Sequence, residues 1–302
     1  MLALITGGHG FVGKHLTGFL RECGDEVVVT DISEGGPDLL DECALNDFFY
    51  SIKPEVVYHL AGQADVGASW QNPGKTFRVN AEGTLNVLLA SRKAGVRRAL
   101  TVSSAEVYGK VRLSDLPIKE SCPLSPASPY AASKAAAEMV SLQQTSDDME
   151  VMRARSFNHF GPGQSEMFVS SAFATRILRA QRSGEKSIPV GRLDTRRDFT
   201  DVRDVVRAYR SIMCDGISGE AYNVCSGYDR EIAELVHALL AEAKSDILLR
   251  PDPNLQRPSD IPILRGDNEK IRLQTGWVPH IEFSQTIEDI IKAARSFIDA
   301  DT

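Results

Sequence analysis

The sequence predicts an α/β protein built on a Rossmann-type, doubly wound parallel sheet, followed by a smaller mixed α/β part. Two observations carry this prediction. Short apolar runs rich in Val, Ile and Leu do not alternate with polar residues, which is typical of strands buried on both faces. Runs with helical periodicity separate them, so that strand and helix alternate along the first half of the chain.

The elements follow from these patterns in chain order. The expected strands of the first half are LALIT (2–6), EVVVT (26–30), EVVYHLA (55–61) and RALTVS (98–103). Helices are expected between and after them, in the segments 10–24, 80–95 and 128–140. Further helices are expected within 166–184, 198–216, 229–244 and 283–300, where the alternation of strand and helix weakens.

The first strand runs into TGGHGFVG, which spans Thr6 to Gly13. Gly7 allows the tight turn, Gly10 lets the backbone approach a pyrophosphate, and Gly13 lets the helix pack closely on the strand. The helix N-terminus that follows offers free N–H groups and a favourable dipole to an anion. This turn predicts a dinucleotide site, with contacts at Gly7, Gly10, Phe11, Val12 and Gly13.

An aspartate, Asp31, directly follows the second strand. A carboxylate there accepts hydrogen bonds from the ribose hydroxyls of the adenosine and repels a 2′-phosphate. It therefore favours NAD(H), with NADP(H) left open, although a solvated loop acid is the alternative. Asp38 and Leu39 are expected to flank the adenine.

Tyr130 and Lys134 lie at positions i and i+4 of an expected helix and so share one face. An ammonium near a phenol favours the ionised phenol and would lower the pKa of Tyr130 from ~10. That pair predicts an acid or base that works near neutral pH.

Composition narrows the possible partners and the setting. The 302 residues have a formal net charge of −7 without a basic stripe, so no nucleic-acid partner is expected. The apolar runs fall short of the ~20 residues of a membrane helix, and a strand starting at Leu2 leaves no room for a signal peptide, so a cytoplasmic location is expected. No metal site is expected. The five cysteines are expected to be reduced, small, buried apolar residues: Cys23, Cys43, Cys122, Cys214 and Cys225.

Four segments together resemble the extended short-chain dehydrogenase/reductase family, also called the NAD-dependent epimerase/dehydratase family: TGGHGFVG, HLAG, SSAEVYG and YAASK. Further segments are similar to its members that handle GDP-linked 6-deoxyhexoses: ARSFNHFGPGQ, GRLDTRRDFTDVRD, AYNVCSG and RPSDIPILRGDNEKI. The resemblance implies an oxidoreductase that reduces the C4 ketone of GDP-4-keto-6-deoxy-D-mannose with NAD(P)H, giving GDP-D-rhamnose or its C4 epimer. It also implies a homodimer built on a four-helix bundle.

The resemblance further implies a division of the chain and roles for single residues. Residues 1–155 would form the NAD(P)-binding domain and 156–302 the substrate-binding domain, with parts of 198–226 as candidates to return to the first. Tyr130 would donate the proton, Lys134 would hold the nicotinamide ribose, and Ser104 would bind the sugar O4. Ala61 would join the cofactor site. The expected substrate contacts are Ser69, Ser104, Glu106, Asn158, Arg197, Arg257 and Asp260.

The stretch SSAEVYG leaves the reaction type open. Many sugar-nucleotide 4,6-dehydratases of this family carry Thr-Asp-Glu where this chain has Ser104, Ala105 and Glu106. Ala105 has no proton to give to a leaving hydroxyl, which favours reduction, but Glu106 is retained. A GDP-mannose 4,6-dehydratase or a nucleotide-sugar 4-epimerase with tightly bound NAD(P) therefore stays an alternative. The intact set of Ser104, Tyr130 and Lys134 argues against a non-catalytic sugar-nucleotide-binding protein.

Overall fold

Six short apolar strands form one parallel sheet, in the order β2-β1-β3-β4-β5-β9. The computed structural model describes residues 1–255 and 261–300. The strands are β1 (Leu2–Thr6), β2 (Glu26–Thr30), β3 (Val56–His59), β4 (Arg98–Ser104), β5 (Glu150–Ser156) and β9 (Ala221–Val224). The strand order, together with helices on both faces, confirms the predicted fold class.

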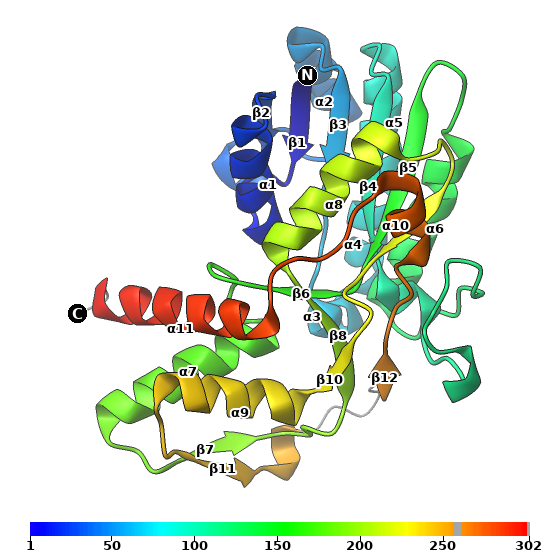
Figure 1. Ribbon diagram of the computed structural model, residues 1–302. Helices are drawn as coiled ribbons and strands as arrows, with labels where there is room; N and C mark the ends of the chain where they lie inside the picture. Colours follow the sequence, from blue (N-terminus) through cyan, green and yellow to red (C-terminus); the bar gives the residue numbers. More distant parts are fainter. Residues whose placement is uncertain (256–260, 301–302) are drawn as a thin grey trace.

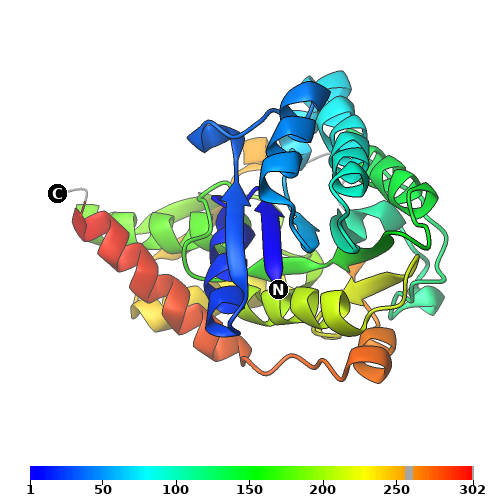
Figure 2. The ribbon, with the colours of Figure 1, turned by 90° about the horizontal axis from the view of Figure 1, so that it is seen from above.

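Helices cover both faces of this sheet because its alternate side chains point to opposite sides. Ala3 and Ile5 of β1 face one core and Leu4 faces another. The first core is closed by α1 (Phe11–Glu22) and α8 (Val202–Asp215), and the second by α2 (Glu42–Ile52) and α5 (Gly83–Lys93). Next to α5 lies α6 (Pro129–Gln143). Figure 2 shows the sheet between these two layers of helices.

A smaller part of the chain lies beyond the carboxyl ends of the strands (Figure 1). Three helices share its apolar core, namely α7 (Val169–Ser183), α9 (Ile232–Ala243) and α11 (Phe283–Ala300). Two parallel strands complete it, β7 (Ser187–Val190) and β11 (Leu248–Pro251). The site therefore has a ready location, because parallel α/β sheets bind their ligands at this edge.

The segment 198–226 is shared between the two parts. β8 (Arg196–Asp201) pairs with β10 (Asp229–Glu231), β12 (Ile263–Leu264) and β6 (Asn158–Phe160) beside the smaller part. In contrast, β9 is a strand of the large sheet and α8 packs on that sheet. The division at residue 155 stays a prediction.

Short elements fill the connections between these helices and strands. They are η1 (Ile32–Glu34), α3 (Val66–Gln71), α4 (Pro73–Phe77), η2 (Arg78–Glu82), η3 (Ala105–Tyr108), η4 (Leu113–Asp115), η5 (Pro253–Leu255) and α10 (Glu269–Thr275). η2 is a π-helical turn between α4 and α5, and the other η elements are 3₁₀ turns. No helix in the described ranges is both long enough and apolar enough to span a bilayer.

The cysteines correct one prediction. Only Cys225 is buried, whereas Cys122 is half-buried and Cys23, Cys43 and Cys214 are exposed. The three exposed thiols lie at helix ends: Cys23 caps the C-terminus of α1, Cys43 lies in the first turn of α2, and Cys214 lies in the last turn of α8. Helix ends reach solvent even where the helix middle is buried, so residue type alone was a poor guide there.

Candidate active site

The glycine turn after β1 fits a pyrophosphate. Gly7 has a φ of +73°, and a side chain there would come within 2.7 Å of the backbone nitrogen of Ala61. At Gly13 an added Cβ would lie 2.3 Å from the carbonyl oxygen of Gly7. Gly10, the N-cap of α1, has no side chain to bond the N–H groups of the first turn. The N–H groups at Phe11 and Val12 therefore remain for an anion.

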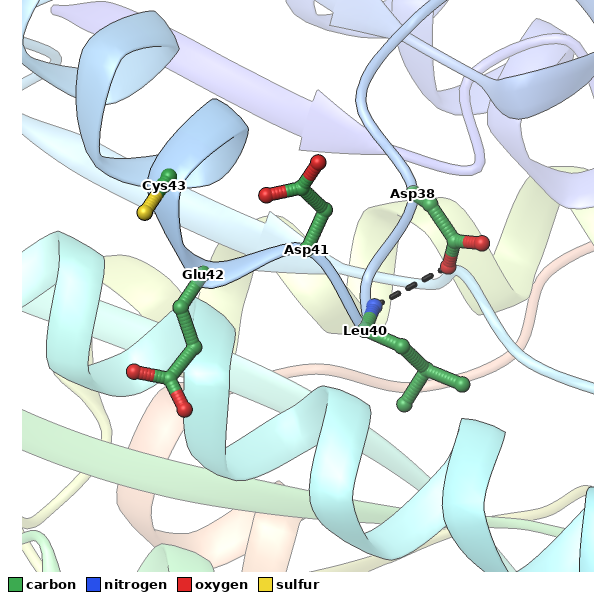
Figure 3. Close-up of a pocket in the computed structure, with 5 residues that line it drawn as sticks. All are labelled: Asp38, Leu40, Asp41, Glu42 and Cys43. Atoms are coloured by element: carbon green, nitrogen blue, oxygen red, sulfur yellow. Dashed lines mark hydrogen bonds between the residues drawn. The ribbon is translucent and has the colours of Figure 1, made fainter.

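The adenosine end of the expected cofactor site is acidic. Asp31 caps η1, with its Oδ1 accepting from the backbone nitrogen (3.1 Å) and the hydroxyl (2.9 Å) of Ser33. Leu39 packs against α5, where a side chain on Gly83 would meet it at 2.9 Å. Asp38, Asp41 and Glu42 help to line a surface hollow (Figure 3).

The expected catalytic residues meet where α6 begins. The Ser104 hydroxyl hydrogen-bonds the Tyr130 phenol and accepts from the backbone nitrogen of Glu106 at 3.2 Å. The Glu106 carboxylate is close enough to Tyr130 to disfavour phenolate. Ser104, Glu106 and Tyr130, three of the residues expected to be catalytic together with Lys134, thus come from the end of β4, the turn η3 and the first turn of α6.

The pKa of Tyr130 corrects the expectation from spacing. Burial raises the pKa of Tyr130 to about 12; the Ser104 hydrogen bond opposes that rise and Glu106 adds to it. Lys134 does not lower it as predicted, because its Nζ donates to the carbonyl oxygen of Val102 at 2.9 Å instead. Burial also lowers the pKa of Lys134 to about 8. Tyr130 is therefore protonated at neutral pH and ready to donate.

Ser69 has a different position from the one predicted. The residue is fully buried in α3, and its hydroxyl donates to the carbonyl oxygen of Val66 at 2.6 Å. The same hydroxyl accepts from the backbone nitrogen of Tyr130 at 3.2 Å. Because Tyr130 is in the first turn of α6, its N–H has no partner within the helix. Ser69 therefore holds the backbone of Tyr130 and is too enclosed to touch a hexose.

The expected substrate residues divide into two groups. Asn158 lies on β6, opposite Phe199 of β8. Arg197 of β8 donates from Nη1 to the carbonyl oxygen of Ile261 at 2.7 Å and to that of Arg196 at 2.9 Å. Both therefore come from strands of the small sheet at the carboxyl edge. Arg257 and Asp260 lie outside the described residues.

The sequence reasoning missed a set of buried polar residues behind these groups. Glu138 continues the series of Tyr130 and Lys134 along α6 and binds Arg155 of β5, with 2.7 Å between Oε2 and Nη2. Asn80 of η2 bonds the backbone of Gln63 and the hydroxyl of Ser133. Two arginines, Arg153 and Arg155, inside the strand EVMRARS were the available signal for Arg155. In the two described ranges, no group of three His, Cys, Asp or Glu side chains is placed to hold a metal ion.

Comparison with known proteins gives consistent similarities. The profile of the GDP-mannose 4,6 dehydratase family matches residues 35–290. The chain is 37% identical over 290 residues to GDP-6-deoxy-D-mannose reductase of Pseudomonas aeruginosa, covering 95% of each chain. The structure of RMD from Pseudomonas aeruginosa with NADPH is similar at a TM-score of 0.90 and 36% identity, covering 98% of this chain and 100% of that one. The Thermus thermophilus UDP-glucose 4-epimerase with NAD gives 0.87 and 30%, covering 98% and 99%.

The hydroxyl of Ser69 generates a stability prediction. Ser69→Ala leaves the buried N–H of Tyr130 without an acceptor, which should lower the free energy of unfolding by about 1–3 kcal/mol. Ser51→Ala is the matched control, because it removes an exposed hydroxyl that bonds the carbonyl of Phe48. Urea unfolding followed by circular dichroism measures both. Equal losses in the two variants would contradict the assigned role of Ser69.

Proposed function

The chain belongs to the GDP-mannose 4,6-dehydratase family of extended short-chain dehydrogenases/reductases, and from this premise we propose that it is a nucleotide-sugar 4-ketoreductase. Its substrate is GDP-4-keto-6-deoxy-D-mannose and its product is GDP-D-rhamnose or the C4 epimer. One observation carries the proposal: the Tyr130 phenol, from the first turn of α6, meets the Ser104 hydroxyl at the end of β4. The similarity to the Pseudomonas reductase along nearly the whole chain supports the same substrate class.

The residues of this chain supply the proton half of the reaction. When bound, reduced NAD(P)H supplies the hydride that forms the new C–H bond at the C4 carbonyl carbon. Tyr130 gives its phenolic proton to O4, so the ketone becomes an alcohol and Tyr130 becomes a phenolate. Ser104 holds O4 and then hydrogen-bonds the phenolate. Lys134, whose pKa of about 8 keeps it mainly cationic at neutral pH, would hold the nicotinamide ribose.

Two features favour reduction over the alternative reactions. Ala105 is buried in an apolar cluster and has no proton for a leaving C6 hydroxyl, so elimination lacks its acid. The chain is also similar along nearly its whole length to the GDP-6-deoxy-D-mannose reductase of Pseudomonas aeruginosa, which favours reduction. The retained Glu106 keeps GDP-mannose 4,6-dehydratase as the second candidate.

The substrate contacts are part of the same proposal. Asn158 and Arg197 face the sugar nucleotide from the small sheet, and Arg197 serves the diphosphate. A guanidinium suits this task because its planar fork donates to phosphate oxygens in pairs. Arg197 also contacts Ile261, which directly follows the segment that carries Arg257 and Asp260 in the sequence.

The proposed cofactor is NADH in preference to NADPH. Residues 22–52 contain nine acidic residues and no Lys or Arg. Asp31 follows β2, and the carboxylates of Asp38, Asp41 and Glu42 line a hollow in the next segment of the chain. A 2′-phosphate would enter this negative field without a cation from that stretch, whereas two ribose hydroxyls would meet the Asp31 carboxylate. NADPH remains usable, as it is bound by the similar Pseudomonas protein.

The reaction type is tested with purified protein and two substrates. With GDP-4-keto-6-deoxy-D-mannose, we expect NADH oxidation, and with GDP-mannose and NAD⁺ no 4-keto product. Tyr130→Phe should lower turnover by ~10²–10⁴-fold. Glu106→Gln should lower it by no more than about tenfold, or ~1.4 kcal/mol, because reduction at C4 removes no C5 proton. Steady formation of 4-keto product from GDP-mannose, abolished by Glu106→Gln, would instead show a dehydratase.

Cofactor choice is tested at Asp31. Asp31→Ala should reduce the preference for NADH over NADPH by about tenfold in kcat/KM, because the repulsion and the ribose contact both disappear. Glu34→Ala is the control, since it removes an exposed acid from the same turn and should change the ratio by less than about threefold. A native enzyme that uses both cofactors equally would refute the proposed role of the carboxylate.

We also propose a homodimer that joins α5 and α6 of two copies into a four-helix bundle. On α6, Met139 and Leu142 are 49% and 46% exposed, and Phe77 of the neighbouring α4 is 50% exposed. Light scattering should give twice the mass of one chain. Met139→Glu should halve that mass by placing a charge on this apolar face. Leu273→Glu, on the exposed face of α10, should leave the dimer intact; a monomeric native protein would exclude it.

A further inference from the structure

Helix α6 carries one more buried ionisable residue than the proposed reaction uses. Tyr130, Lys134 and Glu138 follow one another at intervals of four residues, so they share the face of α6 that packs on the sheet. Glu138 is 1% exposed. A buried carboxylate needs paired charges and hydrogen bonds, so its partners indicate what it does.

The partners of Glu138 come from the two strands beneath α6. Its Oε1 accepts from the Ser103 hydroxyl at 2.6 Å and from Nε of Arg155 at 3.0 Å, and its Oε2 accepts from Nη2 of Arg155 at 2.7 Å. Ser103 and Arg155 are register partners on β4 and β5. One carboxylate thus fastens α6 to both strands, directly beside Ser104.

A second contact fastens the same helix one turn earlier. Lys134 donates to the carbonyl oxygen of Val102, the residue before Ser103. The two contacts together fix how far α6 is displaced along β4. Because Tyr130 is on α6 and Ser104 is on β4, this displacement determines whether phenol and hydroxyl meet.

The network continues toward the segment that follows the catalytic strand. Nη1 of Arg155 donates to the hydroxyl of Tyr108 at 2.9 Å and to the carbonyl oxygen of Glu120 at 3.0 Å. Tyr108 in turn donates to Oδ1 of Asn223 at 2.7 Å. All three side-chain nitrogens of Arg155 therefore have acceptors, which holds the ion pair of Arg155 and Glu138 in one geometry.

We propose that Glu138, held by Ser103 and Arg155, is a positioning residue that aligns Tyr130 and Lys134 with Ser104 during proton donation. The inference rests on the proposed function, since it concerns the same proton-donating residues. Fold stability alone is a weak explanation, because a buried ion pair adds little over a well-packed apolar pair of similar volume. Glu138 contacts the residue next to Ser104 and lies one helix turn from Lys134, which favours a role in aligning the site.

The carboxylate of Glu138 has a second effect on Lys134. Its negative charge favours the ammonium and so opposes the burial that lowers the pKa of Lys134. His59 on β3 also interacts electrostatically with Lys134. Arg153 and Arg155 on β5 face the Glu138 carboxylate. His59 is held neutral, because burial lowers its pKa to about 3. Glu138 is thus the charge on α6 itself that favours the Lys134 ammonium.

The test compares Glu138→Gln and Ser103→Ala with Glu150→Gln in the full chain. We expect Glu138→Gln to lower kcat by about 10–100-fold, with the KM for each substrate changed by less than about threefold. Ser103→Ala should act in the same direction, by about tenfold. Glu150→Gln removes the ion pair with Arg98 at the opposite end of the same two strands and should leave kcat unchanged.

A titration of Lys134 separates alignment from general damage and needs no sugar substrate. In protein with carbon-13-labelled lysine, assigned with Lys134→Ala, Glu138→Gln should lower the midpoint of Lys134 by about half a pH unit or more. The alkaline limb of the kcat/KM profile should move to lower pH by the same amount. Glu138→Asp should keep the midpoint, because the charge is retained, but lose kcat, because the carboxylate is one methylene shorter.

The outcomes distinguish this proposal from the proposed function. A native protein without ketoreductase activity overturns the proposed function, while a lowered Lys134 midpoint in Glu138→Gln would still support the effect of Glu138 on Lys134. Folded Glu138→Gln and Ser103→Ala with native kcat and a native Lys134 midpoint overturn the positioning role. If Glu138→Gln does not fold, the kcat of Ser103→Ala tests the positioning role, because this variant keeps the ion pair between Glu138 and Arg155. A native kcat would then overturn that role.

Discussion

The arrangement of the site depends on a polar contact between α6 and β4 that is buried and must be completely satisfied. Lys134 donates to Val102 and Glu138 accepts from Ser103, both on β4. Arg155 of β5 also binds Glu138, and Ser69 of α3 holds the backbone of Tyr130. Apolar packing tolerates small slides of a helix, whereas a buried hydrogen bond is lost within a fraction of an ångström. These hydrogen bonds therefore fix the Tyr130 phenol opposite the Ser104 hydroxyl.

Burial then decides the chemistry of that phenol. In water, a lysine ammonium one helix turn from a tyrosine would stabilise the phenolate, so the phenol would ionise more readily. Here the lysine turns to a backbone carbonyl, so desolvation dominates and Tyr130 keeps its proton. In the same fold, a different charge on the cofactor or a different arrangement of carboxylates would favour the ionised tyrosine. Relatives that reduce, eliminate or epimerise thus share one scaffold.

Sequence patterns predicted the parts of the molecule that depend on neighbours in the chain. The strands β1 to β4, the helices α1, α5 and α6 and the turn at Gly7 to Gly13 follow from periodicity and from the space that glycine leaves. The strands β5 and β9 and the helix α2 were not predicted. Contacts between distant segments were not accessible in this way. The pairing of Glu138 with Arg155, the enclosure of Ser69 and the exposure of Cys214 depend on how helices meet strands.

The interleaving of the two parts restricts how such an enzyme can be taken apart. The chain leaves the large sheet after β5, returns with α8 and β9, and then leaves it again. A fragment ending at residue 155 would lack α8, and the face of the sheet that contains Ala3 and Ile5 would be open to water. The smaller part is therefore no detachable module. Recombination between relatives would preserve the core only if it exchanged α8 and β9 together with the sheet on which they pack.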